Sequence, residues 1–343
     1  AEFSYIRDIM TSRLSDDRAL HTIGFVLLPG FALMSFAAAT EPFRAADLVA
    51  GRPLWRIRLF AETPVVAASS GATVAAEPLP TRADGLAALF VVAGGSPSGW
   101  HRPAVHQMLR RLAGEGVRLG GISGGPFVLA AAGLLAGRRF TIHWEHAPAL
   151  VEAFPDLRPE RARWIVDRDR LTCGGGIAPL DMMHALIAER LGEDFARRVS
   201  DWFLHTEVGA GEGPQRAALA ERHGVHHPGL LAVLEKMEAT IEAPLSRAAM
   251  ARLAGVSPRH LDRLFALHRG TTFGDDYRRI RLAHADRLLR QSALSIAEIA
   301  FATGFSSSGH FGRAYRALHG QTPSAARRGR TVAESRDVVA RPD

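Results

Sequence analysis

The sequence predicts an α/β fold class: a mostly parallel sheet flanked by helices, followed by an all-α unit with two helix-turn-helix repeats. Apolar runs of strand length alternate with helical patterns between residues 21 and 205, which is typical of strands joined by crossover helices. From residue 229 to 328 the periodicity is helical throughout. Within this stretch a pattern recurs after about 50 residues, which indicates a duplicated unit.

The expected strands of the first unit are short and apolar, as in a sheet buried on both faces. The first of them closes at Pro29-Gly30. Strands are expected at Ile23–Leu28, Trp55–Ala61, Leu86–Ala93, Arg118–Ile122, Arg139–Ile142 and Leu171–Cys173. Helices are expected at Leu33–Leu48, His101–Ala113, Gly124–Leu135, Pro179–Leu191 and Ala196–Leu204.

The chain is expected to divide into five segments. Residues 206–228 are polar and rich in glycine and proline, which is typical of a linker. The expected segments are an N-terminal tail (1–20), the α/β domain (21–205), the linker (206–228), the helical domain (229–330) and a disordered tail (331–343).

Composition argues against several classes of protein. No apolar run reaches about 18 residues, so neither a membrane span nor a membrane partner is expected. The start lacks the apolar core of a signal peptide. The single cysteine, Cys173, cannot form an internal disulfide, and we expect it in the core of a cytoplasmic protein. The histidines cluster only at His226-His227, so no metal and no cofactor are expected.

The positive charge is concentrated in the helical domain. Residues 1–228 carry 24 basic and 24 acidic side chains, whereas residues 229–330 carry 16 basic and 8 acidic ones. The net charge of +7 therefore arises from the second domain. A basic domain beside a neutral one indicates nucleic acid as the partner of the basic one.

Each repeat contains the parts of a helix-turn-helix. Gly255 and Gly304 can end a helix in the left-handed conformation, and the serines that follow can cap the next helix. A long helix, roughly Asp276–Gln291, is expected between the repeats. Polar side chains at the start of each second helix can enter a major groove of double-stranded DNA. The expected DNA contacts are Ser257, Arg259, His260, Asp262, Arg263, Ser307, Ser308, His310 and Arg313.

Residues 229–328 resemble the AraC/XylS family. The matching motifs are Gly255–Leu261, Arg281–Ala283, Ser295–Ala300, Gly304–Ser307 and Gly320–Ser324. The resemblance implies a rigid pair of helix-turn-helix units that read successive major grooves on one face of the DNA. Gly312 stands where the family more often has serine, which weakens one phosphate contact but not the fold.

A G-x-S-x-G motif at Gly121–Gly125 matches the nucleophile elbow of hydrolases. A serine nucleophile also needs a base and an acid that orients the base. Downstream candidates are Asp156, Asp169 or Asp181 for the acid and His184 or His205 for the base. A hydrolase or amidase with Ser123 as nucleophile, fused to a DNA-binding domain, is therefore the alternative function.

Residues 21–205 resemble the PfpI/ThiJ group of the class I glutamine amidotransferase-like superfamily. The resemblance rests on Phe25–Gly30, Val91–Gly95, Gly120–Gly125, Gly133–Arg139 and Thr141–Trp144, and it implies a flavodoxin-like sheet. Enzymes of this group use a cysteine at the elbow, a histidine after it and an acid on the helix after the first strand. Here these positions hold Ser123, Gly124 and, near the third, Ser35. The departure predicts an inactive domain with no catalytic residue.

The elbow could still hold a small molecule. Backbone N–H groups at Gly124 and Gly125, at the start of a helix, suit a carboxylate, whereas aromatic faces and a carboxylate suit a cation. Glu41 could instead form a salt bridge, and Phe36 and Trp144 could be core residues. The expected ligand contacts are Ser123, Gly124, His143, Glu41, Phe36, Trp144 and Trp100.

The order of the two domains resembles the GlxA-type AraC regulators, closest to the subgroup that senses arginine, carnitine, glycine betaine and similar metabolites. Glu41–Ala46, Gly51-Arg52, Trp55-Arg56 and His226–Pro228 carry this resemblance. It implies a cytoplasmic, metabolite-responsive activator of a catabolic operon. Its partners would be promoter DNA, the effector, RNA polymerase and a second copy bound through the first domain. A constitutive regulator whose first domain only dimerises is a further alternative.

Overall fold

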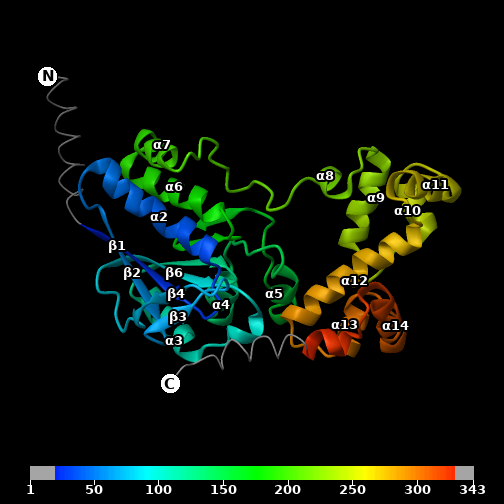
Figure 1. The fold of residues 1–343 in the computed structure, drawn as a ribbon, viewed down its shortest axis with the longest axis horizontal. Helices are drawn as coiled ribbons and strands as arrows, with labels where there is room; N and C mark the ends of the chain where they lie inside the picture. The colour runs from blue at the N-terminus through cyan, green and yellow to red at the C-terminus, as the bar shows by residue number, and fades with distance from the viewer. Residues whose placement is uncertain (1–19, 329–343) are drawn as a thin grey trace. The chain divides into compact units, whose positions relative to one another are not determined.

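The computed structural model describes residues 20–328 and divides into two compact units, with the boundary between Gln215 and Arg216. The expected tails at 1–20 and 331–343 lie outside the described residues, apart from Leu20. Figure 1 shows the first unit as a sheet with helices on both faces and the second as helices alone. The predicted fold class is confirmed.

The first unit is built on a seven-stranded sheet in the order β5-β2-β1-β6-β7-β9-β8. All neighbouring strands are parallel except β8 and β9. The strands are β1 (His21–Leu27), β2 (Trp55–Ala61), β5 (Glu77–Pro78), β6 (Leu86–Ala93), β7 (Arg118–Ser123), β8 (Trp164–Asp167) and β9 (Arg170–Cys173). A separate hairpin pairs β3 (Val65–Ala67) with β4 (Thr73–Ala75).

Two hydrophobic cores lie on opposite faces of this sheet. Successive side chains of a strand point to opposite faces, so Phe25 and Phe90 belong to one core and Val26 and Val91 to the other. The first core is closed by α2 (Leu33–Ala50), α6 (Ala178–Leu191) and α7 (Glu193–Trp202), which lie side by side in Figure 1. The second is closed by α3 (Pro103–Gly114), α4 (Gly125–Ala131) and α5 (Ala147–Ala153).

The structure differs from the expected elements at two places on this side of the sheet. The helix expected over Gly124–Leu135 ends at Ala131, and Gly133 then takes a φ of +76°. The strand expected at Arg139–Ile142 is wrong, because Thr141 makes only an isolated bridge to Glu160. Phe140 and Ile142 are buried nonetheless, so the alternation of polar and apolar residues here belongs to a loop packed on the core.

The segment expected as a linker divides between the two units. Residues up to Gln215 belong to the first unit, and Gly211 O accepts hydrogen bonds from the backbone N–H groups of Arg163 and Trp164. In the second unit a short helix, α8 (Leu219–His223), is followed by Val225, which is fully buried.

The second unit is held together by α12 (Phe273–Gln291), which contributes to two cores. Phe273 and Tyr277 pack in the core of the first repeat, whereas Leu282 and Leu289 pack in that of the second. The first repeat comprises α9 (Pro228–Ala239), α10 (Arg247–Leu253) and α11 (Pro258–Arg269). The second comprises α13 (Ile296–Ala302) and α14 (Ser308–His319).

No helix within residues 20–328 is both long enough and apolar enough to span a bilayer.

The close contact between α4 and the sheet predicts a large cost for one added methyl group. A Cβ at Gly125 would overlap the carbonyl oxygen of Val91 in β6. Gly125→Ala should therefore lower the free energy of unfolding by about 1–3 kcal/mol, as overpacked sites do. Urea denaturation of the whole chain measures the change.

The matched control is Gly114→Ala, at the exposed end of α3, where an added Cβ meets nothing within 4 Å. This control should be neutral or slightly stabilising, because alanine is the better helix former. Equal effects of the two substitutions would contradict the proposed packing constraint.

Candidate DNA-binding and effector sites

The first recognition helix, α11, has the predicted turn. Gly255 adopts a φ of +67°, and the Ser257 hydroxyl accepts a hydrogen bond of 3.2 Å from the N–H of His260. Ser257 is therefore the N-cap of α11, with Pro258 at its first position. Leu261 and Phe265 are buried, so Arg259 and Arg263 are on the exposed side of the helix.

The second recognition helix, α14, repeats this arrangement. Gly304 adopts a φ of +73°, and an added Cβ there would lie 2.7 Å from the carbonyl oxygen of Ile241. The Ser307 hydroxyl caps α14 by accepting from His310 N–H at 3.2 Å. Its core side carries Phe311 and Tyr315.

On the exposed faces of α11 and α14, some polar side chains contact other side chains and others do not. Asp262 forms an ion pair of 2.7 Å with Arg247, and His260 Nδ1 lies 3.4 Å from Arg263. The His310 ring packs against Phe305, 5.4 Å between centroids. Within the described residues, no carboxylate pairs with the exposed arginines Arg259, Arg313 and Arg316. These cationic groups are available to a phosphate or a base edge.

Contacts of two arginine side chains, Arg269 and Arg281, hold the helices that carry these groups. The Arg269 guanidinium donates to Asp276, which is fully buried, at 2.9 Å, and to the carbonyl of His223 at 2.8 Å. Arg281 stacks on Phe305 at 4.2 Å and donates to the carbonyl of Thr303 at 2.7 Å. Both arginines thus serve the scaffold, in contrast to the exposed arginines of α11 and α14.

The elbow of the first unit has the strained geometry that its motif predicts. Ser123 ends β7 with a φ of +59° and is 7% exposed. Gly175 packs closely against it: a Cβ at Gly175 would lie 2.8 Å from Ser123 Cβ and 3.0 Å from Ser35 Oγ. The Ser35 hydroxyl accepts a hydrogen bond of 2.8 Å from Gly176 N–H. The position expected for the family's acid therefore holds a serine bonded to the backbone.

One expectation about the elbow is wrong. The N–H of Gly124 is not free to bind a carboxylate, because it donates to the carbonyl of Ala93 at 2.9 Å. The side of Gly124 that lacks a Cβ is covered by the indole of Trp100, which an added Cβ would overlap. This indole is 2% exposed and donates to the carbonyl of Gly94 at 2.9 Å.

The remaining expected ligand contacts do not all converge on Ser123. Phe36 packs edge-to-face on Phe25 and Phe31, with centroids 6.0 and 5.5 Å away. Glu41 forms an exposed ion pair of 2.6 Å with Arg44 on α2. Six residues beyond Ser35 on a helix, Glu41 is turned by roughly 240° from it. Both side chains take the structural roles that were the alternatives.

His143 and Trp144 lie next to the elbow on a loop. The N–H of His143 donates to Ser123 O at 3.3 Å, and burial lowers the pKa of its imidazole. The N–H of Trp144 donates to Gln215 Oε1 at 2.8 Å. Gln215 Nε2 in turn contacts Thr141 Oγ1 at 2.9 Å, so this side chain fixes the loop. Nothing in the sequence marked Gln215, which lay in the expected linker.

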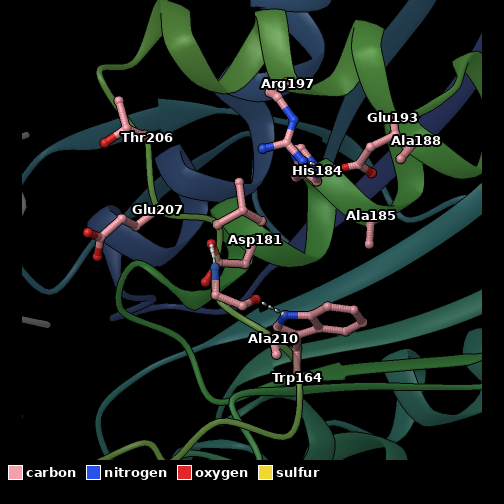
Figure 2. Close-up of a pocket in the computed structure, with 12 residues that line it drawn as sticks. Trp164, Asp181, His184, Ala185, Ala188, Glu193, Arg197, Thr206, Glu207 and Ala210 are labelled. Atoms are coloured by element: carbon pink, nitrogen blue, oxygen red, sulfur yellow. Dashed lines mark hydrogen bonds and ion pairs between the residues drawn. The ribbon is translucent and has the colours of Figure 1, made fainter.

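An open pocket of about 690 Å³ lies away from the elbow, between α6, α7 and residues 206–210. Figure 2 shows Trp164 at one side, with Asp181, His184, Glu193 and Arg197 around the space. Two glycines of the expected linker are closely packed here: an added Cβ at Gly209 would overlap Arg163, and one at Gly211 would lie 2.7 Å from Trp164 O.

Asp181 and His205, candidates for a hydrolase, do pair with each other but in this pocket region. The fully buried Asp181 carboxylate accepts from His205 Nε2 at 2.6 Å and from Gly209 N–H at 3.0 Å, and it pairs with Arg163 at 2.7 Å. His184 Nδ1 lies 2.8 Å from the Ser200 hydroxyl. Ser123 is not among the partners of Asp181, His205 or His184.

Within the described residues, neither the cysteine nor a cluster of metal ligands supplies a reactive site. Cys173 is fully buried, and burial raises the pKa of its thiol to about 12, so the thiol is protonated and unreactive. Within residues 20–328, no group of three or more His, Cys, Asp or Glu side chains is placed to hold a metal ion.

Comparison with known proteins matches both units. Residues 25–189 match the DJ-1/PfpI family, and residues 250–329 match a helix-turn-helix domain. The chain is 62% identical over 316 residues to the HTH-type transcriptional regulator GlxA of Rhizobium meliloti (strain 1021), covering 92% of this chain and 98% of that protein. It is 41% identical to the HTH-type transcriptional regulator CdhR of Pseudomonas aeruginosa, covering 88% and 89%.

Among solved structures, an AraC family transcriptional regulator from Pseudomonas putida aligns with a TM-score of 0.50 at 26% identity, covering 53% of this chain and 99% of that one. The capped recognition helices and the strained elbow thus occur in a chain whose relatives match it over most of its length. The chain belongs to the family of HTH-type transcriptional regulators that join a DJ-1/PfpI-like unit to an AraC-type helix-turn-helix unit.

Proposed function

We propose that this protein is a sequence-specific DNA-binding transcription regulator whose first unit senses a small molecule. The observation that carries the proposal is the pair of capped recognition helices, α11 and α14, whose exposed arginines lack carboxylate partners within the described residues. The excess of basic over acidic residues falls in the same unit. The relatives named as transcriptional regulators cover nearly the whole chain, which supports the same assignment.

On α11 and α14, individual side chains have distinct proposed roles. Arg259, His260 and Arg263, with His310 and Arg313, are proposed to reach base edges or phosphates. Ser257 and Ser307 cap the helices, and we propose that they and Ser308 offer backbone N–H groups to a phosphate. Asp262 is held by Arg247, so its proposed role is to orient that arginine at the DNA.

The regulatory proposal is finer. We propose a small amino-acid-like or betaine-like effector, activation of a catabolic operon together with RNA polymerase, and a homodimer formed through the first unit. A regulator of this kind acts on the chromosome, so the cytoplasm is the proposed location. The proposed effector, activation, homodimer and location go beyond the role in transcription that the relatives' names give, and they depend on that role.

The competing function, a hydrolase with Ser123 as nucleophile, has less support. The Ser123 side chain has Gly175 and Ser35 as neighbours, and the pair of Asp181 and His205 is engaged elsewhere. His143 lies next to the elbow, but within residues 20–328 no histidine ring hydrogen-bonds to the Ser123 hydroxyl. A serine that no base engages stays protonated at neutral pH and is a weak nucleophile. We therefore propose that the first unit binds a ligand without turning it over.

DNA binding by the whole chain should weaken steeply with salt. If the second unit neutralises about six phosphates, the logarithm of the association constant should fall with a slope of about −5 against the logarithm of salt concentration. Fluorescence anisotropy with promoter DNA measures the slope. A flat response, or no binding at low salt, would contradict the proposal.

Arg259→Ala should relax base preference at one position of the first half-site and cost about 1–3 kcal/mol of specific binding. His310→Ala should act in the same way at the second half-site. Competition binding with single-base operator variants measures both effects. The control is Arg278→Ala, which removes an exposed arginine paired with Asp275 on α12 and should leave preference unchanged. Uniform weakening on all sequences would show that Arg259 and His310 contact only phosphate.

Ser123→Ala should remove no hydrolytic activity, because the wild type should have none above background. The measurement is release of p-nitrophenol from p-nitrophenyl acetate, including the first turnover. A burst in the wild type that is lost in Ser123→Ala would favour the enzyme over the regulator.

A further inference from the structure

The loop between α9 and α10 of the first repeat touches the turn of the second repeat. An added Cβ at Gly304, in the turn between α13 and α14, would lie 2.7 Å from the carbonyl oxygen of Ile241 and 2.7 Å from ring carbons of Pro244. At Gly255, the equivalent position of the first repeat, an added Cβ would meet nothing within 4 Å. Both glycines have the left-handed conformation that ends a helix. The close approach at Gly304 is therefore a contact between the repeats and not a requirement of the turn.

Tyr277 of α12 holds both ends of this loop. It is 4% exposed, and its hydroxyl donates to the carbonyl of Thr240 at 2.7 Å. The same hydroxyl accepts a hydrogen bond of 3.3 Å from the N–H of Leu245. One buried side chain of α12 thus fixes residues 240–245 in place.

Arg281 holds the turn of the second repeat from the same face of α12. Its Nε donates to the carbonyl of Thr303 at 2.7 Å, and its guanidinium lies 4.2 Å from the centre of the Phe305 ring. Residues four apart, such as Tyr277 and Arg281, are neighbours on one face of a helix. The loop of one repeat and the turn of the other are therefore held side by side. We call residues 240–245 and 303–305, with these two side chains, the inter-repeat junction.

The junction adds a second connection to the one that α12 provides. The two cores of the second unit share no residue, and Figure 1 shows α12 running from the first repeat to the second. Long helices bend gently, so α12 by itself would let the repeats tilt against each other. A contact away from the axis of α12 opposes that tilt.

The turn that is held in the junction leads into the second recognition helix. Gly304 lies three residues before Ser307, which is the N-cap of α14. Phe305 is 3% exposed and packs in the same core as Phe311 of α14, with ring centroids 5.4 Å apart. A displacement of the turn would therefore displace α14.

We propose that the inter-repeat junction fixes the orientation of α14 relative to α11, and that Tyr277 and Gly304 are positioning residues that determine which spacing of two recognition sequences the protein accepts. The proposal rests on the proposed function, in which both helices read double-stranded DNA. It adds residues that influence the choice of DNA from within the protein, through the helices that they hold.

Distances between the recognition helices test the junction without DNA. Spin labels attached at Ala266→Cys in α11 and Ala317→Cys in α14, both exposed positions, report the distance distribution by double electron–electron resonance. The native Cys173 is fully buried and should stay unlabelled. Tyr277→Phe removes only the hydroxyl, and Gly304→Ala pushes the loop and the turn apart. Both substitutions should broaden or shift the distribution relative to the unsubstituted labelled protein.

Gly255→Ala is the matched control for Gly304→Ala. The two glycines have φ values of +67° and +73°, so alanine is strained alike at both, but only Gly304 presses on the other repeat. Ser292→Ala is the control for loss of a hydroxyl, since Ser292 Oγ bonds to the Leu288 carbonyl within the end of α12. Both controls should keep the original distribution. An unchanged distribution in Tyr277→Phe, or equal changes in Gly304→Ala and Gly255→Ala, would overturn the proposal.

Selection of bound sequences from a random pool of DNA duplexes tests the consequence for DNA. The wild type should enrich two recognition sequences at one spacing. Tyr277→Phe should enrich the same two sequences, with discrimination against one inserted base pair lowered about three- to tenfold, as expected for the loss of one or two hydrogen bonds. A purely structural loss would instead lower enrichment at every spacing and leave the preferred spacing as sharp as before, and that outcome would overturn the role in spacing.

The two measurements separate this inference from the proposed function. A wild type that enriches one recognition sequence or none contradicts reading by both helices, and with it the role of the junction in spacing. The distances between the spin labels judge the junction on its own, because they are measured on the protein without DNA.

Discussion

Burial of the parallel sheet on both faces is the constraint on which the first unit depends. Phe25 and Phe90 face one core while Val26 and Val91 face the other, so β1 and β6 have no side open to solvent. Helices must then lie close to the strands, and at the end of β7 this closeness leaves room only for glycine. An added Cβ at Gly121 or Gly125, two residues before and after Ser123, would overlap backbone atoms. Close packing therefore requires glycine on both sides of the elbow serine.

Much of this could be predicted from the sequence. The apolar runs predict the main strands, because a strand buried on both faces is apolar whichever strands it pairs with. The caps Ser257 and Ser307 and the glycines before them were also local signals. β8 was missed, since its four residues become a strand only by pairing with β9. The hydrogen bonds of Gly124 were missed for a related reason: whether an N–H is free depends on the neighbouring strand.

The pocket lay beyond prediction because its parts are distant in sequence and individually ordinary. Trp164, Asp181 and Glu207 belong to a strand, a helix and a stretch that composition marks as a linker. Only Gly209 and Gly211 hinted at close approach, and glycine is equally common in flexible segments. Composition describes what a segment would do alone, whereas the hydrogen bonds from Gly209 to Asp181 and from Gln215 to Thr141 tie this segment to residues outside it.

The length of α12 has a consequence for the operator. This helix packs in the core of each repeat, so it fixes the separation of the two recognition helices. Its 19 residues span about 28 Å, comparable with the roughly 34 Å of one turn of B-DNA. If α11 and α14 each read one sequence, as proposed, the two sequences keep a fixed spacing on one side of the duplex. Inserting half a turn between them would place one sequence on the opposite side, beyond the reach of a helix that cannot stretch.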